Sequence, residues 1–208
     1  EDDPYSELRF AGEAVPPIAA LAEGEARHWA VYLASMSKTM APALRIGWLV
    51  APPEIRRRCV SAKAADDMAS SAWIQEVVAQ YLANGRYGEH VPRIRAAYGQ
   101  RCDAMAEALA RELNGRVTFS KPEGGMFFWA RLTGEVDATR LLPYAIEHEV
   151  VYVPGKAFYA DAAQADLHAM RMSFATMNES QIAQGMVRLG RALDACEANQ
   201  PVSISLAA

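Results

Sequence analysis

Two short apolar runs around a polar loop constrain the fold of this chain most. The runs cover residues 29–34 and 44–50 and are rich in aliphatic and aromatic side chains. Short apolar runs bounded by polar residues predict strands buried in a sheet. Ligands of open α/β sheets collect at the carboxyl ends of strands. The loop that follows the first run is therefore the first candidate for a functional site.

This loop places hydroxyl groups next to an amine. Ser35 and Ser37 lie three residues and one residue before Lys38, and Arg45 follows seven residues after it, at the start of the second run. Hydroxyl and guanidinium groups donate well to phosphate, and a lysine amine can form a Schiff base with an aldehyde. Pyridoxal phosphate needs both donors for its phosphate and an amine that forms a Schiff base with its aldehyde. A lone S-x-S-K pattern is also common in solvated turns, so this interpretation depends on the rest of the chain.

Five segments in a fixed order resemble the class I/II aminotransferases of the fold-type I pyridoxal-phosphate family. The nearest subgroup contains the 2-aminoadipate, aromatic and branched-chain aminotransferases. The segments are residues 1–10, 35–48, 121–129, 153–159 and 170–174. The resemblance implies an α/β fold, the C-terminal part of the fold-type I structure, with pyridoxal 5'-phosphate as the cofactor. It also implies amino transfer between an α-amino acid and a 2-oxo acid, with glutamate and 2-oxoglutarate as the default pair.

The same resemblance implies roles at the ring of the cofactor. Lys38 matches the catalytic lysine that holds the cofactor and moves a proton from the substrate Cα. Asp2 matches the carboxylate that pairs with the pyridine nitrogen, and a carboxylate there keeps the pyridinium charged. Tyr5 matches the phenol that hydrogen-bonds the ring oxygen. Without the resemblance, an acidic residue beside Pro4 at the start of this sequence is simply a solvated side chain.

Phosphate and substrate contacts follow in the same way. Ser35, Ser37 and Arg45 match phosphate ligands, and Arg171 matches the arginine that binds the substrate α-carboxylate through its planar guanidinium. Residues 170–175 alternate between apolar and other side chains. A strand there would bury one set and turn Arg171 to the opposite face, although a strand arginine is also common on protein surfaces.

Composition limits the class of protein. The chain has 208 residues, 51% of them hydrophobic, and a net charge of -4, which argues against a general nucleic-acid binder. No apolar stretch approaches the roughly 20 residues of a membrane span, and no signal peptide is visible. The three cysteines, Cys59, Cys102 and Cys196, lie far apart and have no metal-ligand spacing. We expect reduced packing cysteines in a cytoplasmic protein without a metal site.

Periodicity divides the chain into unequal parts. We expect residues 1–50 to form the C-terminal strands of an incomplete large domain, residues 51–196 a small α+β domain, and residues 197–208 a frayed tail. The clearest helix has an apolar stripe between Ile94 and Leu113. Asn178 and Gln181 predict a capping box at the start of the last helix. Other helices are expected after Pro52, around residues 74–82 and over 137–148, and strands over 117–120, 125–132, 150–153 and 169–175.

The resemblance begins at the aspartate of the family pattern, so the chain corresponds to about its C-terminal half. The phosphate-binding helix N-terminus, the ring that stacks on the pyridine and the asparagine beside the ring oxygen precede this region in the family. We expect the intact protein to be a homodimer, because family sites lie at a dimer interface. We also expect further polypeptide to cover the two apolar strands. Residues 1–208 by themselves are expected to be inactive.

Two other functions fit the same scaffold. A MocR-type transcriptional regulator carries an aminotransferase-like domain behind a helix-turn-helix, and the residues before Glu1 would distinguish it. The Asp-Asp-Pro-Tyr and Pro-Glu-Gly-Gly-Met-Phe segments resemble the free-standing enzymes. A pyridoxal-phosphate lyase or decarboxylase is the second alternative. Arg171 would suit any α-amino acid, so a product assay is needed to separate these reactions.

Overall fold

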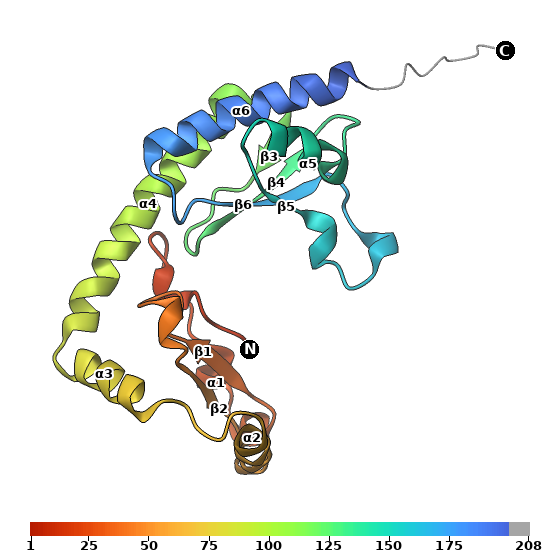
Figure 1. The fold of residues 1–208 in the computed structure, drawn as a ribbon. Coiled ribbons are helices and arrows are strands. Elements are labelled where there is room, and N and C mark those ends of the chain that lie inside the picture. The colour runs from red at the N-terminus through yellow and green to blue at the C-terminus, as the bar shows by residue number, and fades with distance from the viewer. Residues whose placement is uncertain (200–208) are drawn as a thin grey trace. The chain divides into compact units, whose positions relative to one another are not determined.

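The computed structural model describes residues 1–199 and divides into two compact units (Figure 1). The first unit contains residues 1–97 and 123–125, and the second contains residues 98–122 and the chain from 126 onward. The boundary lies inside α4 (Arg86–Glu112) and not after residue 50, where the sequence predicted a change of domain. The assignment of residues 1–50 and 51–196 to two domains of the family stays a prediction.

The first unit contains a small sheet. Strand β1 (Tyr32–Ser35) pairs antiparallel with β2 (Gly47–Val50), and Asp2 forms a parallel bridge with Leu33 on the other side of β1. Both predicted strands are therefore present, but each is shorter than the apolar run that predicted it. The other elements are η1 (Ser6–Leu8), α1 (Ile18–Leu21), η2 (Gly24–His28), η3 (Pro42–Leu44), α2 (Pro53–Asp66) and α3 (Ala72–Ala83).

The strands of this sheet carry exposed apolar side chains. Leu33, Trp48 and Val50 are 41%, 42% and 56% exposed within the described chain, and the expectation that further polypeptide covers the two strands stays a prediction. The sheet has only two strands and therefore offers little apolar area to a second layer. Apolar surface of this kind usually belongs to an interface.

The second unit is built on a four-stranded antiparallel sheet (Figure 1). The strand order is β3-β4-β6-β5. The strands are β3 (Val117–Phe119), β4 (Phe127–Leu132), β5 (Val153–Pro154) and β6 (Ala169–Ser173). The helices α5 (Ala138–Glu147) and α6 (Glu179–Ala198) pack against each other in the same unit. The remaining elements are η4 (Gly155–Phe158) and η5 (Ala162–Gln164).

Alternation along β4 and β6 separates the core from the opposite face of the sheet. Phe128 and Met170 are fully buried, whereas Trp129 is 43% exposed and Arg171 is half-buried. The predicted alternation around Arg171 is therefore confirmed. The Phe128 ring meets the rings of Phe119 and Phe174 edge to face, with centroids 5.5 and 5.8 Å apart. Such pairs add to the stabilisation that burial supplies.

The helix predictions for this unit are confirmed. The stripe on the C-terminal half of α4 is buried at Cys102, Met105 and Leu109, as expected for core packing. Helix α6 begins with a capping box, in which the side chains of Asn178 and Gln181 each accept a hydrogen bond from the backbone N–H of the other. The helix continues through Ala198 into the expected tail, and residues 200–208 of that tail lie outside the described residues.

The cysteines differ in their environments. Cys102 and Cys196 are buried, and burial raises the pKa of the Cys102 thiol to about 11. Cys59 is exposed on α2, so the prediction that all three are packing residues is wrong for this one. Within residues 1–199, no helix combines the length and the apolar character that a membrane span requires.

Adjacent residues of β4 provide a test of the sheet. Phe128→Ala should lower the free energy of unfolding by about 3–5 kcal/mol, because it leaves a cavity among buried rings. Trp129→Ala should lower it much less, because this side chain lies on the half-exposed face. Urea denaturation followed by circular dichroism measures both. Equal losses for the two variants would contradict the assignment of the faces.

Candidate functional site

Ser35 and Ser37 lie together at the end of β1. The Ser35 hydroxyl donates to Ser37 Oγ at 2.9 Å, has Ile46 O as an alternative acceptor at 3.2 Å, and accepts from the Ser37 N–H at 3.0 Å. The Met36 N–H also donates to Ile46 O at 3.0 Å. These bonds fix the end of β1 against the residues that lead into β2. The loop therefore presents two adjacent hydroxyl groups, as the sequence predicted.

Lys38 occupies the turn that follows. Its neighbours Met36 and Thr39 are 7% and 4% exposed, so buried side chains on both sides anchor the turn. The Met40 N–H closes it by donating to Met36 O at 2.9 Å. Lys38 itself is half-buried, and within residues 1–199 its amine makes no hydrogen bond or ion pair. The turn is therefore anchored, and the amine that it carries is available to a ligand.

Arg45 differs from its predicted setting. Strand β2 begins at Gly47, so Arg45 precedes the strand and is exposed instead of being fixed at its start. Its backbone is left-handed, with φ of 53°, and its Nη1 donates to Pro42 O at 3.3 Å. This conformation is uncommon for a residue other than glycine and costs about 1–3 kcal/mol. Such strain is frequent at binding sites.

Asp2 and Ser35 line the same open pocket, whose volume is about 480 Å³. The backbone around Asp2 is held by β1, because the Asp3 N–H donates to Leu33 O at 2.8 Å and the Leu33 N–H donates to Glu1 O at 2.9 Å. Helix α2 contributes Arg56 and Lys63 to the lining of the pocket. Asp2 and Ser35, which are far apart in the sequence, thus line one pocket. Ser37, Lys38 and Arg45 lie on the loop between β1 and β2.

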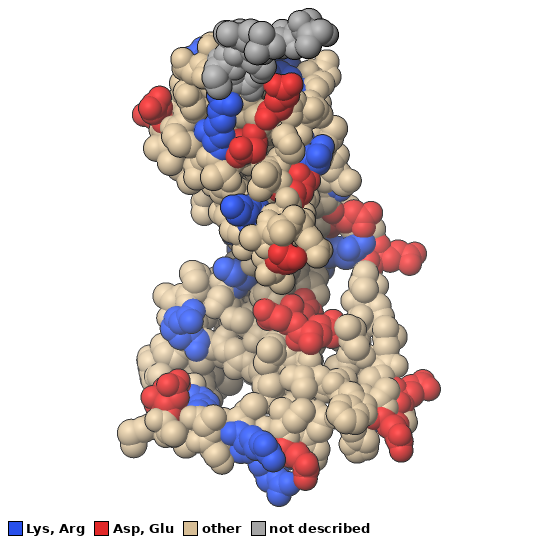
Figure 2. Space-filling model, turned by 90° about the vertical axis from the view of Figure 1, so that its right-hand side faces the viewer, with Lys and Arg blue, Asp and Glu red and all other residues tan. Residues whose placement is uncertain are grey.

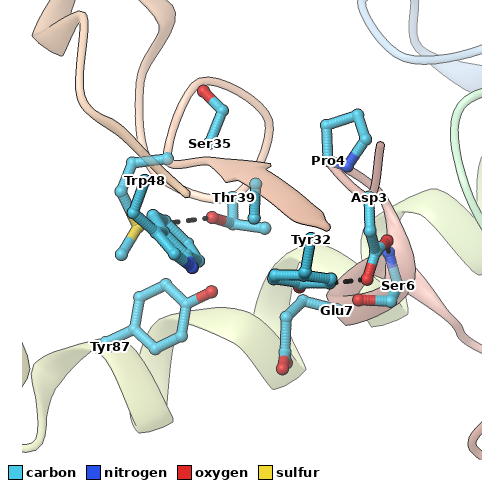
Figure 3. Close-up of a pocket in the computed structure, with 11 residues that line it drawn as sticks. Asp3, Pro4, Ser6, Glu7, Tyr32, Ser35, Thr39, Trp48 and Tyr87 are labelled. Carbon is cyan, nitrogen blue, oxygen red and sulfur yellow. Dashed lines mark hydrogen bonds between the residues drawn. The ribbon is translucent and has the colours of Figure 1, made fainter. Parts of the chain in front are cut away.

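Asp3 was missed by the sequence analysis, which treated the acidic pair before Pro4 as solvated apart from the match of Asp2. Its Oδ1 accepts from the Ser6 N–H at 2.9 Å, and its Oδ2 accepts from the Tyr32 hydroxyl at 3.1 Å (Figure 3). Partial burial acts to raise the pKa of Asp3, but the hydrogen bonds from Ser6 and Tyr32 bring it below its usual value. Asp3 thereby connects the start of η1, where Tyr5 lies, to β1.

A second pocket, of about 190 Å³, lies beside this carboxylate (Figure 3). Tyr87 reaches into it from α4, next to Trp48 of β2 and Thr39 of the lysine turn. Burial raises the pKa of Tyr87, and a hydrogen bond with Thr39 only partly offsets this effect. The Thr39 hydroxyl also lies 3.8 Å from the Met36 sulfur. Tyr87 therefore supports the turn of Lys38 from the interior of the first unit.

Arg171 belongs to the second unit, whereas the other predicted site residues belong to the first. Its Cζ lies 4.2 Å from the ring centroid of Phe127 and 4.6 Å from that of Phe158. Within residues 1–199 its guanidinium makes no hydrogen bond or ion pair. Neither ring was predicted to contact Arg171, although both lie in segments that carry the family resemblance.

The donor groups of the first unit suit a phosphorylated aldehyde with a basic ring nitrogen. Ser35, Ser37 and Arg45 offer hydrogen-bond donors for phosphate, Asp2 offers an anion for a protonated ring, and Lys38 offers an amine without a partner in the described chain. These five residues fit pyridoxal phosphate by their chemistry.

Comparisons with known proteins agree with this chemistry. The family model for class I and II aminotransferases matches residues 2–189. Aromatic-amino-acid aminotransferase 1 of Thermococcus litoralis is 39% identical over 93% of this chain and 45% of its own length. The structure of LysN, an α-aminoadipate aminotransferase from Thermus thermophilus in complex with N-(5'-phosphopyridoxyl)-L-leucine, matches with a TM-score of 0.86 and 36% identity, over 95% of this chain and 50% of that chain.

A transcriptional regulator is also similar to this chain. The uncharacterized HTH-type regulator YdfD of Bacillus subtilis is 30% identical over 91% of this chain and 38% of its own length. The chain thus spans about half the length of the aminotransferases it matches, and less of the regulator. The mixed α/β structure and these matches confirm the fold class that the sequence predicted.

The bond between Tyr32 and Asp3 should make stability depend on pH. Because the pKa of Asp3 is lower in the folded chain, the bond contributes stability above the unfolded pKa of about 3.9 and loses it as pH falls through the folded pKa. Tyr32→Phe should lower the free energy of unfolding by about 0.5–1.5 kcal/mol at pH 6 and by less at pH 3. Urea titrations at both pH values measure the difference.

Tyr81→Phe is the matched control, since the Tyr81 hydroxyl makes no hydrogen bond within the described chain and the substitution keeps the ring that meets His90 edge to face. It should change stability equally at the two pH values. A deficit for Tyr32→Phe that is larger at pH 3 than at pH 6 would contradict the role of Asp3.

Proposed function

The chain belongs to the class I and II aminotransferase family, and we propose that it supplies the catalytic lysine and the substrate-carboxylate arginine of a pyridoxal-phosphate-dependent aminotransferase. The observation that carries the proposal is the Lys38 amine, which has no partner within residues 1–199 and lies on an anchored turn beside two hydroxyl groups 2.9 Å apart. The whole enzyme is proposed to act as a homodimer in the cytoplasm.

Five residues would hold the cofactor together with Lys38. Ser35, Ser37 and Arg45 bind the phosphate, Asp2 pairs with the ring nitrogen, and Tyr5 donates to the ring oxygen. When bound, pyridoxal phosphate supplies an aldehyde for amine exchange and a ring that accepts electrons from the substrate Cα. An ionised Asp2 keeps the ring nitrogen protonated, which this chemistry requires. The first three residues are hydrogen-bond donors and Asp2 is a carboxylate, so each group suits its partner.

Lys38 acts as the general acid and base in this proposal. The Lys38 amine would take the proton from the substrate Cα, and the bound cofactor would accept the electrons that this proton leaves behind. Arg171 binds the α-carboxylate, which amino acid and 2-oxo acid substrates share. Glutamate and 2-oxoglutarate are the proposed common pair. The relatives named above act on aromatic amino acids and α-aminoadipate, as their names state. We therefore propose that the second amino acid, which exchanges its amino group with this pair, has a side chain larger than that of glutamate.

A regulatory function is the second candidate, because the HTH-type regulator YdfD shares this region. Figure 2 shows acidic and basic side chains interspersed on one face of the described residues, without the continuous basic surface that a DNA backbone favours. Whether the full-length protein carries a helix-turn-helix distinguishes the two functions.

Chemical labelling tests the role of Lys38. Borohydride reduction of the full-length protein with pyridoxal phosphate should attach a pyridoxyl group to Lys38, detected by peptide mass spectrometry. Lys38→Ala should lower turnover by about a hundredfold or more, because a general acid and base is lost. Lys121→Ala is the control, since Lys121 is an exposed lysine in an ion pair with Asp103. Labelling at a different lysine would refute the assignment.

Substitution of Asp2 should change kcat, whereas substitution of Arg171 should change KM. Asp2→Asn should lower kcat, because the ring then withdraws electrons less strongly. Arg171→Ala should raise KM by about 10- to 150-fold for acidic and neutral amino acids alike, because a charged hydrogen bond to the shared α-carboxylate is lost. Steady-state kinetics with two amino donors separates these effects. An unchanged KM for Arg171→Ala would show that this arginine does not bind the carboxylate.

A further inference from the structure

We propose that Phe127 and Phe158 are positioning residues that hold the Arg171 guanidinium ready for the substrate carboxylate. The inference rests on the proposed function, in which Arg171 binds that carboxylate. It assigns a role to the 153–159 segment, which carries the family resemblance but has no place in the chemistry described above.

The Arg171 guanidinium contacts aromatic rings, whereas those of Arg131 and Arg116 form ion pairs. Its Cζ lies over the rings of Phe127 and Phe158 at 4.2 and 4.6 Å, well inside the range of about 6 Å for a cation–π contact. By contrast, Arg131 on the same sheet face donates to Asp166 at 2.8 Å, and Arg116 donates to Asp194 at 2.7 Å. The two rings restrain the guanidinium without neutralising its charge.

This arrangement leaves hydrogen-bond donors available. A ring contacts the face of a guanidinium, whereas its five N–H groups point outward in its plane. Within residues 1–199, no carboxylate or carbonyl accepts from Arg171. An incoming carboxylate can therefore take two parallel hydrogen bonds from an arginine whose conformational freedom is already reduced.

The sheet register brings the first ring to Arg171. Arg171 of β6 lies directly opposite Trp129 of β4, so Phe127 is its diagonal neighbour on the same face. The second ring arrives through η4, at whose end Phe158 stands. Trp129 contacts Phe158 edge to face, with centroids 5.6 Å apart and planes at 78°. Trp129 thereby supports the ring that supports Arg171.

Gly155 permits this placement of η4. A Cβ added at Gly155 would lie 2.5 Å from Ala169 Cβ and 2.8 Å from Ala169 O. Glycine is therefore the residue that lets the start of η4 approach the start of β6 so closely. A larger residue would push η4 away from the sheet, and Phe158 would move with it.

An apolar wall for the substrate side chain is the alternative role of these rings, and a pair of ligands separates the two roles. Isothermal titration of the full-length holoenzyme with 3-phenylpropionate and with its neutral amide gives two Kd values, neither ligand having an amine that can react. Phe127→Leu and Phe158→Leu should each lower the preference for the carboxylate over the amide by about two- to thirtyfold. Phe158→Tyr keeps a ring and should retain the preference.

A control variant and a variant at Gly155 complete the test, and two kinds of result would overturn the inference. Phe119→Leu, on the adjacent strand β3, removes a ring that contacts Phe128 and should leave the preference unchanged. Gly155→Ala should lower the preference although both rings are still present. Equal weakening of both ligands in the Phe127→Leu and Phe158→Leu variants would show an apolar wall and overturn the inference, as would no change in either. If Arg171→Leu keeps the full preference, the proposed carboxylate role of Arg171 fails instead.

Discussion

The antiparallel pairing of β4 with β6 is the constraint on which the second unit depends. Because successive side chains of a strand point to opposite faces, one register buries Phe128 and Met170 and turns Trp129 and Arg171 to the other side. A slip of one residue would bury Arg171 in the core and expose the large apolar side chains. The core that stabilises the sheet and the Arg171 guanidinium of the proposed function are therefore positioned by the same hydrogen bonds.

The first unit depends on backbone pairing in a similar way. Residues 1–3 pair with one side of β1 and β2 pairs with the other, so β1 lies between two segments that are distant in sequence. Ser35 Oγ and the Met36 N–H reach Ile46 O across this pairing. The proposed ring, phosphate and lysine contacts are consequently placed by one strand, and Asp3 reinforces the arrangement through its bond with Tyr32.

Acidic and basic side chains are satisfied in different ways in this protein. Asp3 is satisfied by hydrogen bonds and its pKa is lowered by them, which keeps it ionised at neutral pH. Lys38 and Arg171 have no hydrogen-bonding or ionic partners within residues 1–199. Buried neighbours anchor the turn that carries Lys38, and two aromatic rings contact Arg171. Both basic groups therefore keep their bonding capacity for a ligand. Lys38 in the first unit and Arg171 in the second are thereby suited to the cofactor and to the carboxylate of the proposed function.

The sequence by itself determined the local elements and the family. Periodic apolar residues predicted the α4 stripe, Asn178 with Gln181 predicted the start of α6, and alternation predicted the orientation of Arg171, because each of these signals lies within a few turns or one strand. The tertiary structure alone decided the left-handed backbone of Arg45, the Tyr32–Asp3 bond and the rings around Arg171. These depend on strand register and close backbone approach between distant segments, which no local pattern encodes.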